Sequence, residues 1–472
     1  MTRPNVVLIH CHDLGTYLGC YGRSVDTPNI DRLAEEGVRF DRHFVTAPQC
    51  SPSRSSLFTG RHPHQNGMLG LAHGDWEIHP DERLLPELLG EAGYETHLFG
   101  LQHVTEYPGR LGYDERHAET PLTESAQPAV HETARAQNVA ERVSSVLENG
   151  EYEPPFFASV GFFELHRVEE DGGFGFEADR YDAPDPDEVD PLEFLPDEPG
   201  IRADIAGLEG MLGALDDGVG TILSALEAAG VDDETLVVFT TEHGLAMPRA
   251  KGCCFDPGIE AALLMRYPDR LEAGRVVDDL VSNVDVFSTL LAFADAPSPD
   301  DGRIAGRSFA SLLDDDLGGT EYDPRDRIFA GMTWHDRYNP VRAIRTDRWK
   351  YVRNFWHLPE VYLTTDIYCS EAGKAVREDY YGRQRPYEEL YDLEADPLER
   401  RNLLDGEATH GTERADVADS APADETDHES VRDRLRDELL EWMHETNDPL
   451  LEGPVLPSDW EEIHLEMGDD RR

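Results

Sequence analysis

The chain has 472 residues, 39% of them hydrophobic, so it is long enough to bury a large core. Asp and Glu number 97 against 42 Lys plus Arg, which gives a formal net charge of -55 at pH 7. So acidic a chain is unsuited to nucleic acid, because phosphates bind to basic faces.

The acidic residues are spread along the whole length instead of forming one tail, and the sequence holds few lysines. A basic partner or an anion-avoiding surface would explain this charge, but its even spread favours adaptation to a salt-rich cell. At molar salt the Debye length is only about 3 Å, so the self-repulsion is screened. We therefore expect a halophilic source.

The first apolar run, at 6–9, is too short for a signal-peptide core or a membrane span, and no other stretch approaches spanning length. Six scattered cysteines do not form a disulfide framework in a chain of this size. These features predict a cytoplasmic protein with reduced thiols and with neither a membrane nor a nucleic-acid partner.

Three apolar, strand-like runs end in polar clusters. The run at 6–9 leads into His12 and Asp13, the run at 156–162 into Glu164 and His166, and the run at 236–241 into Glu242 and His243. Continuous apolar runs are typical of buried parallel strands, and ligands bind at the carboxyl ends of such strands. The three clusters should therefore converge on one site.

Amphipathic helical patterns cover 129–147, 204–229 and 282–294, between and after these strands. This alternation predicts an α/β fold, a large and mainly parallel sheet sandwiched by helices. The stretch at 182–199 is rich in Pro, Asp and Glu and is expected to be an exposed loop.

After residue 330 the pattern changes to short strand-like pieces at 341–345 and 349–352, followed by a helix at 431–444. We predict a catalytic domain at 1–330 and a smaller C-terminal α+β subdomain at 331–472, with an antiparallel sheet that could close over the site. The acidic segment at 405–430 holds almost nothing apolar, so disorder is expected there.

The most specific motif is Cys50-Ser51-Pro52-Ser53-Arg54, followed by Thr59-Gly60. It resembles the signature of the sulfatase family, Cys-x-Pro-x-Arg with a downstream Thr-Gly. Further stretches at 26–37, 60–67 and 389–403 resemble family landmarks in the expected order. Within the family, the sulfamidase branch is most similar, through 64–68, 103–104 and 442–449.

The resemblance implies an alkaline phosphatase-like fold and a nucleophile made from Cys50, which a formylglycine-generating enzyme would oxidise. The hydrate of such an aldehyde carries two oxygens on one carbon, so that one can attack sulfur and the other can later expel sulfate. A buried free cysteine in a Ser-rich loop is the alternative reading of Cys50.

Family members hold one divalent cation, usually calcium, and the matching positions here are His12, Asp13, Cys50, Glu242 and His243. His12 stands where an acid is expected, and Glu242 replaces an aspartate. Carboxylates suit calcium, whereas the two imidazoles would suit manganese or another transition metal. Alternatively, His12 is a neutral, hydrogen-bonded core imidazole and Glu242 caps the following turn.

The resemblance also implies catalytic roles. Arg54 would face the hydrate and the anionic substrate, His103 would deprotonate the hydrate or help to break down the sulfo-enzyme, and His166 and Lys251 would hold sulfate oxygens and assist the leaving group. Leu101 replaces the lysine of the family pattern Gly-Lys-x-His, which removes one contact with the anion.

The expected function is therefore hydrolysis of a sulfate ester or sulfamate on a sugar-like molecule. A phosphonate monoester or phosphodiester hydrolase of the same fold is one alternative, since an acid-His pair like Glu242-His243 occurs in such relatives. A non-catalytic anion-binding relative is the other, because of Leu101 and His12. The oligomeric state stays open.

Overall fold

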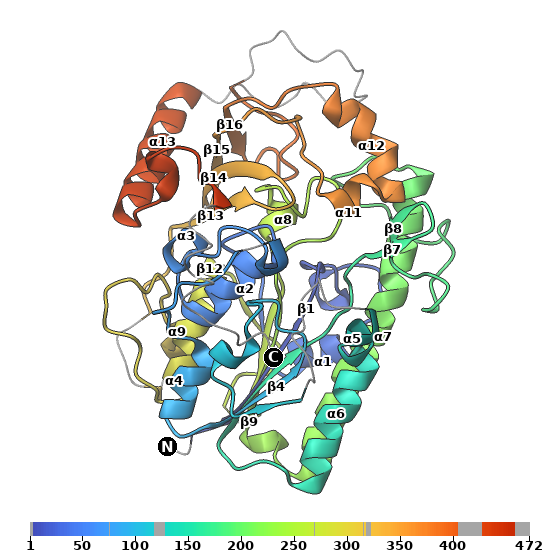
Figure 1. The fold of residues 1–472 in the computed structure, drawn as a ribbon, viewed down its shortest axis with the longest axis vertical. Helices are drawn as coiled ribbons and strands as arrows, with labels where there is room; N and C mark the ends of the chain where they lie inside the picture. The colour runs from blue at the N-terminus through green and yellow to red at the C-terminus, as the bar shows by residue number, and fades with distance from the viewer. Residues whose placement is uncertain are drawn as a thin grey trace.

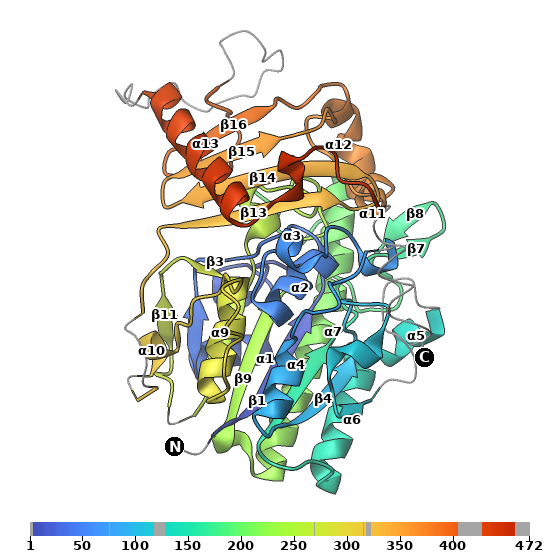
Figure 2. The same cartoon turned by 60° about the vertical axis from the view of Figure 1, so that its left-hand side comes forward.

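The structure is a computed structural model that describes residues 3–74, 76–117, 128–268, 270–314, 316–317, 322–404 and 427–457. Its centre is an eight-stranded sheet in the order β11-β2-β10-β9-β1-β6-β4-β5 (Figures 1 and 2). The strands are β1 (Asn5–Cys11), β2 (Val38–Phe40), β4 (Glu95–Gly100), β5 (Glu115–Arg116), β6 (Phe156–Gly161), β9 (Thr235–Thr241), β10 (Leu263–Arg266) and β11 (Arg275–Val277).

The central strand β1 runs parallel to both of its neighbours, β6 and β9, and β10 pairs antiparallel with β9 and β2. Side chains of β1 alternate between the two faces, with Val7 and Ile9 in one apolar core and Val6 and Leu8 in the other. Both faces are buried, which is why the parallel strands are continuous apolar runs.

Helices cover both faces of this sheet (Figure 1). One layer contains α1 (Pro28–Glu35), α6 (Ala136–Asn149) and α7 (Pro199–Ala229), and the other contains α2 (Cys50–Thr59), α4 (Leu85–Glu91), α9 (Asn283–Phe293) and α10 (Ala310–Leu313). The predicted α/β sandwich is confirmed.

A second, antiparallel sheet has the order β13-β14-β15-β16 and carries α13 (His428–Glu445) on one face (Figure 2). Its strands are β13 (Arg327–Trp334), β14 (Tyr338–Thr346), β15 (Trp349–Asn354) and β16 (Glu388–Asp392), and the short helices α11 (Thr365–Tyr368) and α12 (Glu371–Tyr381) lie between β15 and β16. The predicted antiparallel C-terminal sheet is thus present, and the expected boundary at 330/331 falls inside β13.

The remaining short elements are β3 (His43–Phe44), β7 (Val168–Glu170), β8 (Gly173–Gly175), β12 (Val281–Ser282), α3 (Pro63–Asn66), α5 (Pro128–Thr133) and α8 (Asp256–Ile259), with single 3-10 turns at 19–21, 72–74, 108–111, 232–234 and 449–451. Within the described ranges, no helix combines the length and the apolar character needed to cross a bilayer.

Several predicted elements differ in detail from the structure. The pattern at 129–147 is split into α5 and α6, and α7 begins five residues before the predicted start, at Pro199, a favoured first helical residue. The loop at 182–198 is not uniformly exposed, because Val189, Leu192 and Phe194 anchor it in the core. Of the segment predicted to be disordered, 405–426 lies outside the described residues and 428–430 begin α13.

Candidate active site

The polar residues after β1, β6 and β9 meet at the carboxyl edge of the large sheet. Cys11 and Thr241, the last residues of β1 and β9, are paired in register, so Asp13 and Glu242 leave the sheet side by side. The loop after β6 joins them, because the backbone N–H of His12 donates to the carbonyl of Glu164 at 3.1 Å. The predicted convergence of the three strand ends is therefore present in the structure.

Helix α2 brings Cys50 to this edge. Cys50 is the first residue of α2, its side chain is completely buried, and its Sγ lies 3.5 Å from His243 Nε2. The helix ends at Gly60, which has a φ of 68° and where a Cβ would lie 2.5 Å from the Phe287 ring. Glycine is required there, which gives the Thr-Gly part of the motif a packing role.

Four candidate ligands surround one point. One ligand atom from each of Asp13, Cys50, Glu242 and His243 lies within 4.8 Å of the others, and all four residues are buried. His243 Nε2 is 3.3 Å from Asp13 Oδ1 and 3.3 Å from Glu242 Oε1. Asp13 Oδ1 has no hydrogen-bond partner in the part of the chain that is described. Two carboxylates, one of them with an oxygen that lacks a hydrogen-bond partner among the described residues, and one imidazole form a group that fits a divalent cation.

Two residues of the site have left-handed backbones, Asp13 with a φ of 51° and His103 with a φ of 47°. Residues other than glycine adopt this conformation at an energetic cost, and such strain is concentrated at functional sites. The packing of the surrounding loops therefore holds both side chains in an orientation that the free chain would avoid.

His12 lies beside the four ligands and contacts them through Glu242. Its Nδ1 donates to Glu242 Oε1 at 2.6 Å, and His12 also belongs to a second group, with Cys50 and His103, whose ligand atoms lie within 4.8 Å of one another. Burial lowers the pKa of His12 to about 4, so the ring is neutral at pH 7. The structure thus agrees with the alternative of a neutral, hydrogen-bonded imidazole. The Glu242 carboxylate contacts His12 and Arg54.

Arg54 is buried and directs its guanidinium at protein groups. Nε donates to Glu242 Oε2, one Nη contacts His10 Nδ1 at 2.5 Å, and the other donates to the Cys11 carbonyl at 3.0 Å. Burial would raise the pKa of the Glu242 carboxyl, but Arg54 and then His12 hold it well below its usual range. These contacts are all with protein groups, and the orientation of Arg54 toward the hydrate and the anion stays a prediction.

A group of histidines lines the same edge. The His12 ring centroid lies 5.8 Å from that of His103 and 5.0 Å from that of His166. His103 Nε2 is 3.2 Å from His73 Nδ1, and His166 Nδ1 donates to the Arg167 carbonyl at 2.7 Å. His73 was not predicted, because it comes from an isolated 3-10 turn that follows no strand.

Lys251 bridges two carboxylates. Its Nζ lies 3.1 Å from Asp13 Oδ2 and 3.1 Å from Asp366 Oδ2. Asp366 belongs to α11, between the last strands of the C-terminal sheet, and the sequence analysis missed it, because the flanking Thr364 and Thr365 indicate only a helix start. Burial would raise the pKa of Asp366, yet Lys251 above all holds it below its usual range.

The position of the missing family lysine is part of the core. Leu101 is fully buried and packs with Ala134 and Phe163. The Gln102 amide orders the following turn, since its Oε1 accepts from the backbone N–H groups of Val104 and Thr105 at 2.5 and 3.0 Å. His103 is thereby supported by the turn, while the side chain at 101 serves packing.

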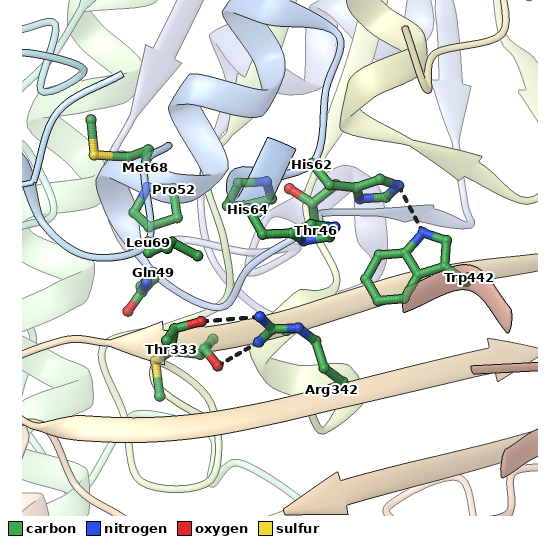
Figure 3. Close-up of a pocket in the computed structure, with 13 residues that line it drawn as sticks. Thr46, Gln49, Pro52, His62, His64, Met68, Leu69, Thr333, Arg342 and Trp442 are labelled. Carbon is green, nitrogen blue, oxygen red and sulfur yellow. Dashed lines mark hydrogen bonds between the residues drawn. The ribbon is translucent and has the colours of Figure 1, made fainter. Parts of the chain in front are cut away.

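A small cavity of about 10 Å³ lies between the C-terminal sheet and α2 (Figure 3). On the cavity wall, Trp442 Nε1 donates to His62 Nε2 at 3.4 Å and Arg342 donates to Thr333 Oγ1 at 3.1 Å. Arg342 also forms a buried ion pair with Asp448. The C-terminal sheet therefore lies beside the start of the helix that carries Cys50.

The chain matches known proteins over most of its length. The sulfatase family model matches residues 4–296, and a model described as "N-sulphoglucosamine sulphohydrolase, C-terminal" matches 242–371. Human N-sulphoglucosamine sulphohydrolase is 29% identical over an alignment that covers 96% of this chain and 92% of the human protein.

Solved structures share the fold. The phosphonate monoester hydrolase of Agrobacterium radiobacter has a TM-score of 0.67 at 21% identity, with 94% of this chain and 96% of that chain covered. A structure in complex with its substrate D-glucosamine-2-N,6-O-disulfate has a TM-score of 0.65 at 20% identity, and the alignment covers 96% of this chain and 99% of that chain.

Three observations indicate the same family: the Cys50 motif, the convergence of three strand ends, and the family match over residues 4–296. The chain belongs to the sulfatase family and is a hydrolase that acts on sulfate ester or sulfamate bonds.

Proposed function

We propose that the enzyme removes sulfate from a sulfated sugar, as an O-sulfate or an N-sulfate, with a nucleophile made from Cys50 by a formylglycine-generating enzyme. When residue 50 carries formylglycine, its hydrate supplies one oxygen that attacks sulfur and a second that expels sulfate as the carbonyl reforms. The burial of Cys50 among titratable side chains supports this role, because an inert core cysteine would have apolar neighbours.

We further propose that one divalent cation is held by Asp13, residue 50, Glu242 and His243, with His12 orienting Glu242 by its hydrogen bond. Such a cation would polarise the sulfate and the nucleophile as a Lewis acid. The two carboxylates favour calcium or manganese, and the imidazole of His243 allows a transition metal.

The other residues are proposed to handle protons and charge. His103 is proposed to remove the proton from the hydrate, because it contacts both His73 and the His12 ring. Lys251 and His166 are proposed to bind the sulfate oxygens and assist the leaving group. Arg54 is proposed to act indirectly, by keeping Glu242 ionised.

The group formed by Asp13, Cys50, Glu242 and His243 is the observation on which this proposal depends. It is tested by peptide mass spectrometry of the protein from its native host, where conversion lowers the mass of residue 50 by the difference between sulfur plus two hydrogens and one oxygen. Active native protein with an unmodified Cys50 thiol would contradict it. Cys50→Ala should abolish turnover, and Cys20→Ala, which changes a thiol remote from the site, should not.

Phosphonate or phosphodiester hydrolysis is a second candidate, supported by the acid-His pair Glu242-His243 and by the fold shared with a phosphonate monoester hydrolase. Sulfate, sulfamate and phosphodiester substrates should be compared in molar salt, and the class with the highest kcat/KM identifies the reaction. The net charge of -55 supports a salt-rich setting, and the six free cysteines support a reducing, cytoplasmic one. We also retain the division into 1–330 and 331–472 as a proposal.

A further inference from the structure

The segment at 364–366 reaches the active site from the C-terminal part of the chain. Asp366 is only 8% exposed, and its Oδ2 shares the Lys251 ammonium with Asp13 Oδ2. Because one nitrogen contacts both carboxylates, Asp366 lies next to the candidate metal ligands although more than 300 residues separate it from Asp13 in the sequence. It therefore borders the proposed sulfate pocket.

Two buried polar atoms of this segment lack hydrogen bonds within the described chain. They are Asp366 Oδ1 and Thr364 Oγ1, and Thr364 is fully buried. The Thr364 hydroxyl lies close enough to Asp366 to help lower its pKa as a weak hydrogen-bond donor, but neither Thr364 Oγ1 nor Asp366 Oδ1 has a partner at a full hydrogen-bond distance and angle within the described chain. Thr364 is also the N-cap residue of α11, where a hydroxyl commonly accepts from the backbone, and it makes no such bond. Buried groups of this kind normally have a partner.

The charge of Asp366 limits what that partner can be. A carboxylate repels the sulfate group itself, so it cannot be a sulfate ligand. It attracts hydrogen-bond donors, and Oδ1 remains available for one while Oδ2 is paired with Lys251. Thr364 can donate and accept. A hydroxyl or ammonium group beside the sulfated atom would satisfy both side chains, whereas an aryl ring would satisfy neither.

We propose that Asp366 and Thr364 form a subsite for hydroxyl or amino groups of the sulfated molecule, so that the enzyme selects sulfated polyols and amino sugars over aryl sulfates. This inference rests on the proposed sulfatase function. It makes Asp366 and Thr364 specificity-determining residues supplied by the C-terminal region, while the candidate nucleophile and metal ligands come from the large sheet and α2.

The test compares kcat/KM for a glucosamine sulfate and for 4-nitrophenyl sulfate, whose ring carries no donor, in wild type, Asp366→Asn and Thr364→Val. Asn keeps an oxygen for Lys251, and Val keeps the shape of Thr without touching the ion pair. Each variant should lose about 10- to 100-fold on the sugar substrate, as expected for a hydrogen bond to a charged or buried group, and change little on the aryl substrate.

Asp392→Asn is the matched control, because Asp392 is a buried acid of the same region whose partner is Arg348 instead of Lys251. It should alter neither substrate. Equal losses on both substrates in Asp366→Asn and Thr364→Val, no loss in either variant, or a wild type that prefers the aryl sulfate would overturn the subsite. A wild type that cleaves no sulfate at all would instead refute the sulfatase function, and the inference with it.

Discussion

Arg54→Ala should weaken metal binding without removing any candidate ligand. In the native protein the guanidinium contacts Glu242, His10 and the Cys11 carbonyl, all in the interior. Without it, burial, which is already the largest influence on Glu242, is opposed mainly by His12 and His243, so the pKa of this carboxyl should rise. A protonated Glu242 is a poor ligand, so calcium or manganese binding should require a higher pH than in the wild type.

The size of the effect follows from burial. Both partners of the Arg54–Glu242 ion pair are 1% exposed, and removing one partner of a buried pair destabilises a protein by about 3–5 kcal/mol. The native Glu242 has a depressed pKa, so its contribution to stability is present above the ordinary carboxyl pKa and is lost as the pH falls through the folded-state value. The stability deficit of Arg54→Ala should therefore be largest at neutral pH and shrink in acid.

The assay is urea unfolding with a chelator at several pH values, together with titration calorimetry of calcium and manganese, in molar salt. Arg61→Ala is the matched control. Arg61 is equally buried, and its guanidinium lies 2.8 Å from Glu82 in an ion pair that is remote from the candidate ligands. It should lose similar stability and bind metal with the native pH dependence. If both variants bind metal alike at every pH, the coupling between Arg54 and Glu242 is refuted.

Three further predictions concern stability. Leu101→Lys should lower the free energy of unfolding by several kcal/mol instead of restoring the family contact, because its side chain would enter the apolar cluster of Ala134 and Phe163; an active, stable variant in denaturant titration would refute this. Asp448→Ala should cost about 3–5 kcal/mol in the same titration, since Arg342 loses both of its bonds to the carboxylate, and a loss below 1 kcal/mol would show that this pair contributes little. Dilution from molar to about 10 mM salt lengthens the Debye length from about 3 to about 30 Å and should lower the melting temperature measured by circular dichroism, whereas an unchanged value would contradict salt adaptation.

The sequence predicts the three adjacent strands β6, β1 and β9 of the large sheet, because they are buried on both faces and their apolar runs are continuous, but it does not indicate the other five strands. The convergence of their polar ends follows as well, since parallel neighbours place Asp13 and Glu242 at one edge. The start of α7 was missed, because the amphipathic pattern becomes clear only after Pro199 has begun the helix.

The candidate site is predictable where residues follow strands or belong to a spaced motif, as Cys50 and His243 do. It is not predictable where packing alone decides. Asp366 follows no strand and joins the site only because α11 packs against the loop that carries Lys251. The helix spacing places Arg54 one turn after Cys50, yet it does not indicate that the guanidinium turns to Glu242.

The complete burial of Cys50 bears on the order of events in biosynthesis. A thiol at the first turn of α2, enclosed by loops that follow β1 and β9, offers no surface to another protein once the sheet has assembled. If residue 50 is converted to formylglycine as proposed above, the oxidising enzyme must therefore meet the nascent or unfolded polypeptide. The yield of mature protein should then depend on whether oxidation is complete before β9, which is synthesised about 185 residues later, joins the sheet.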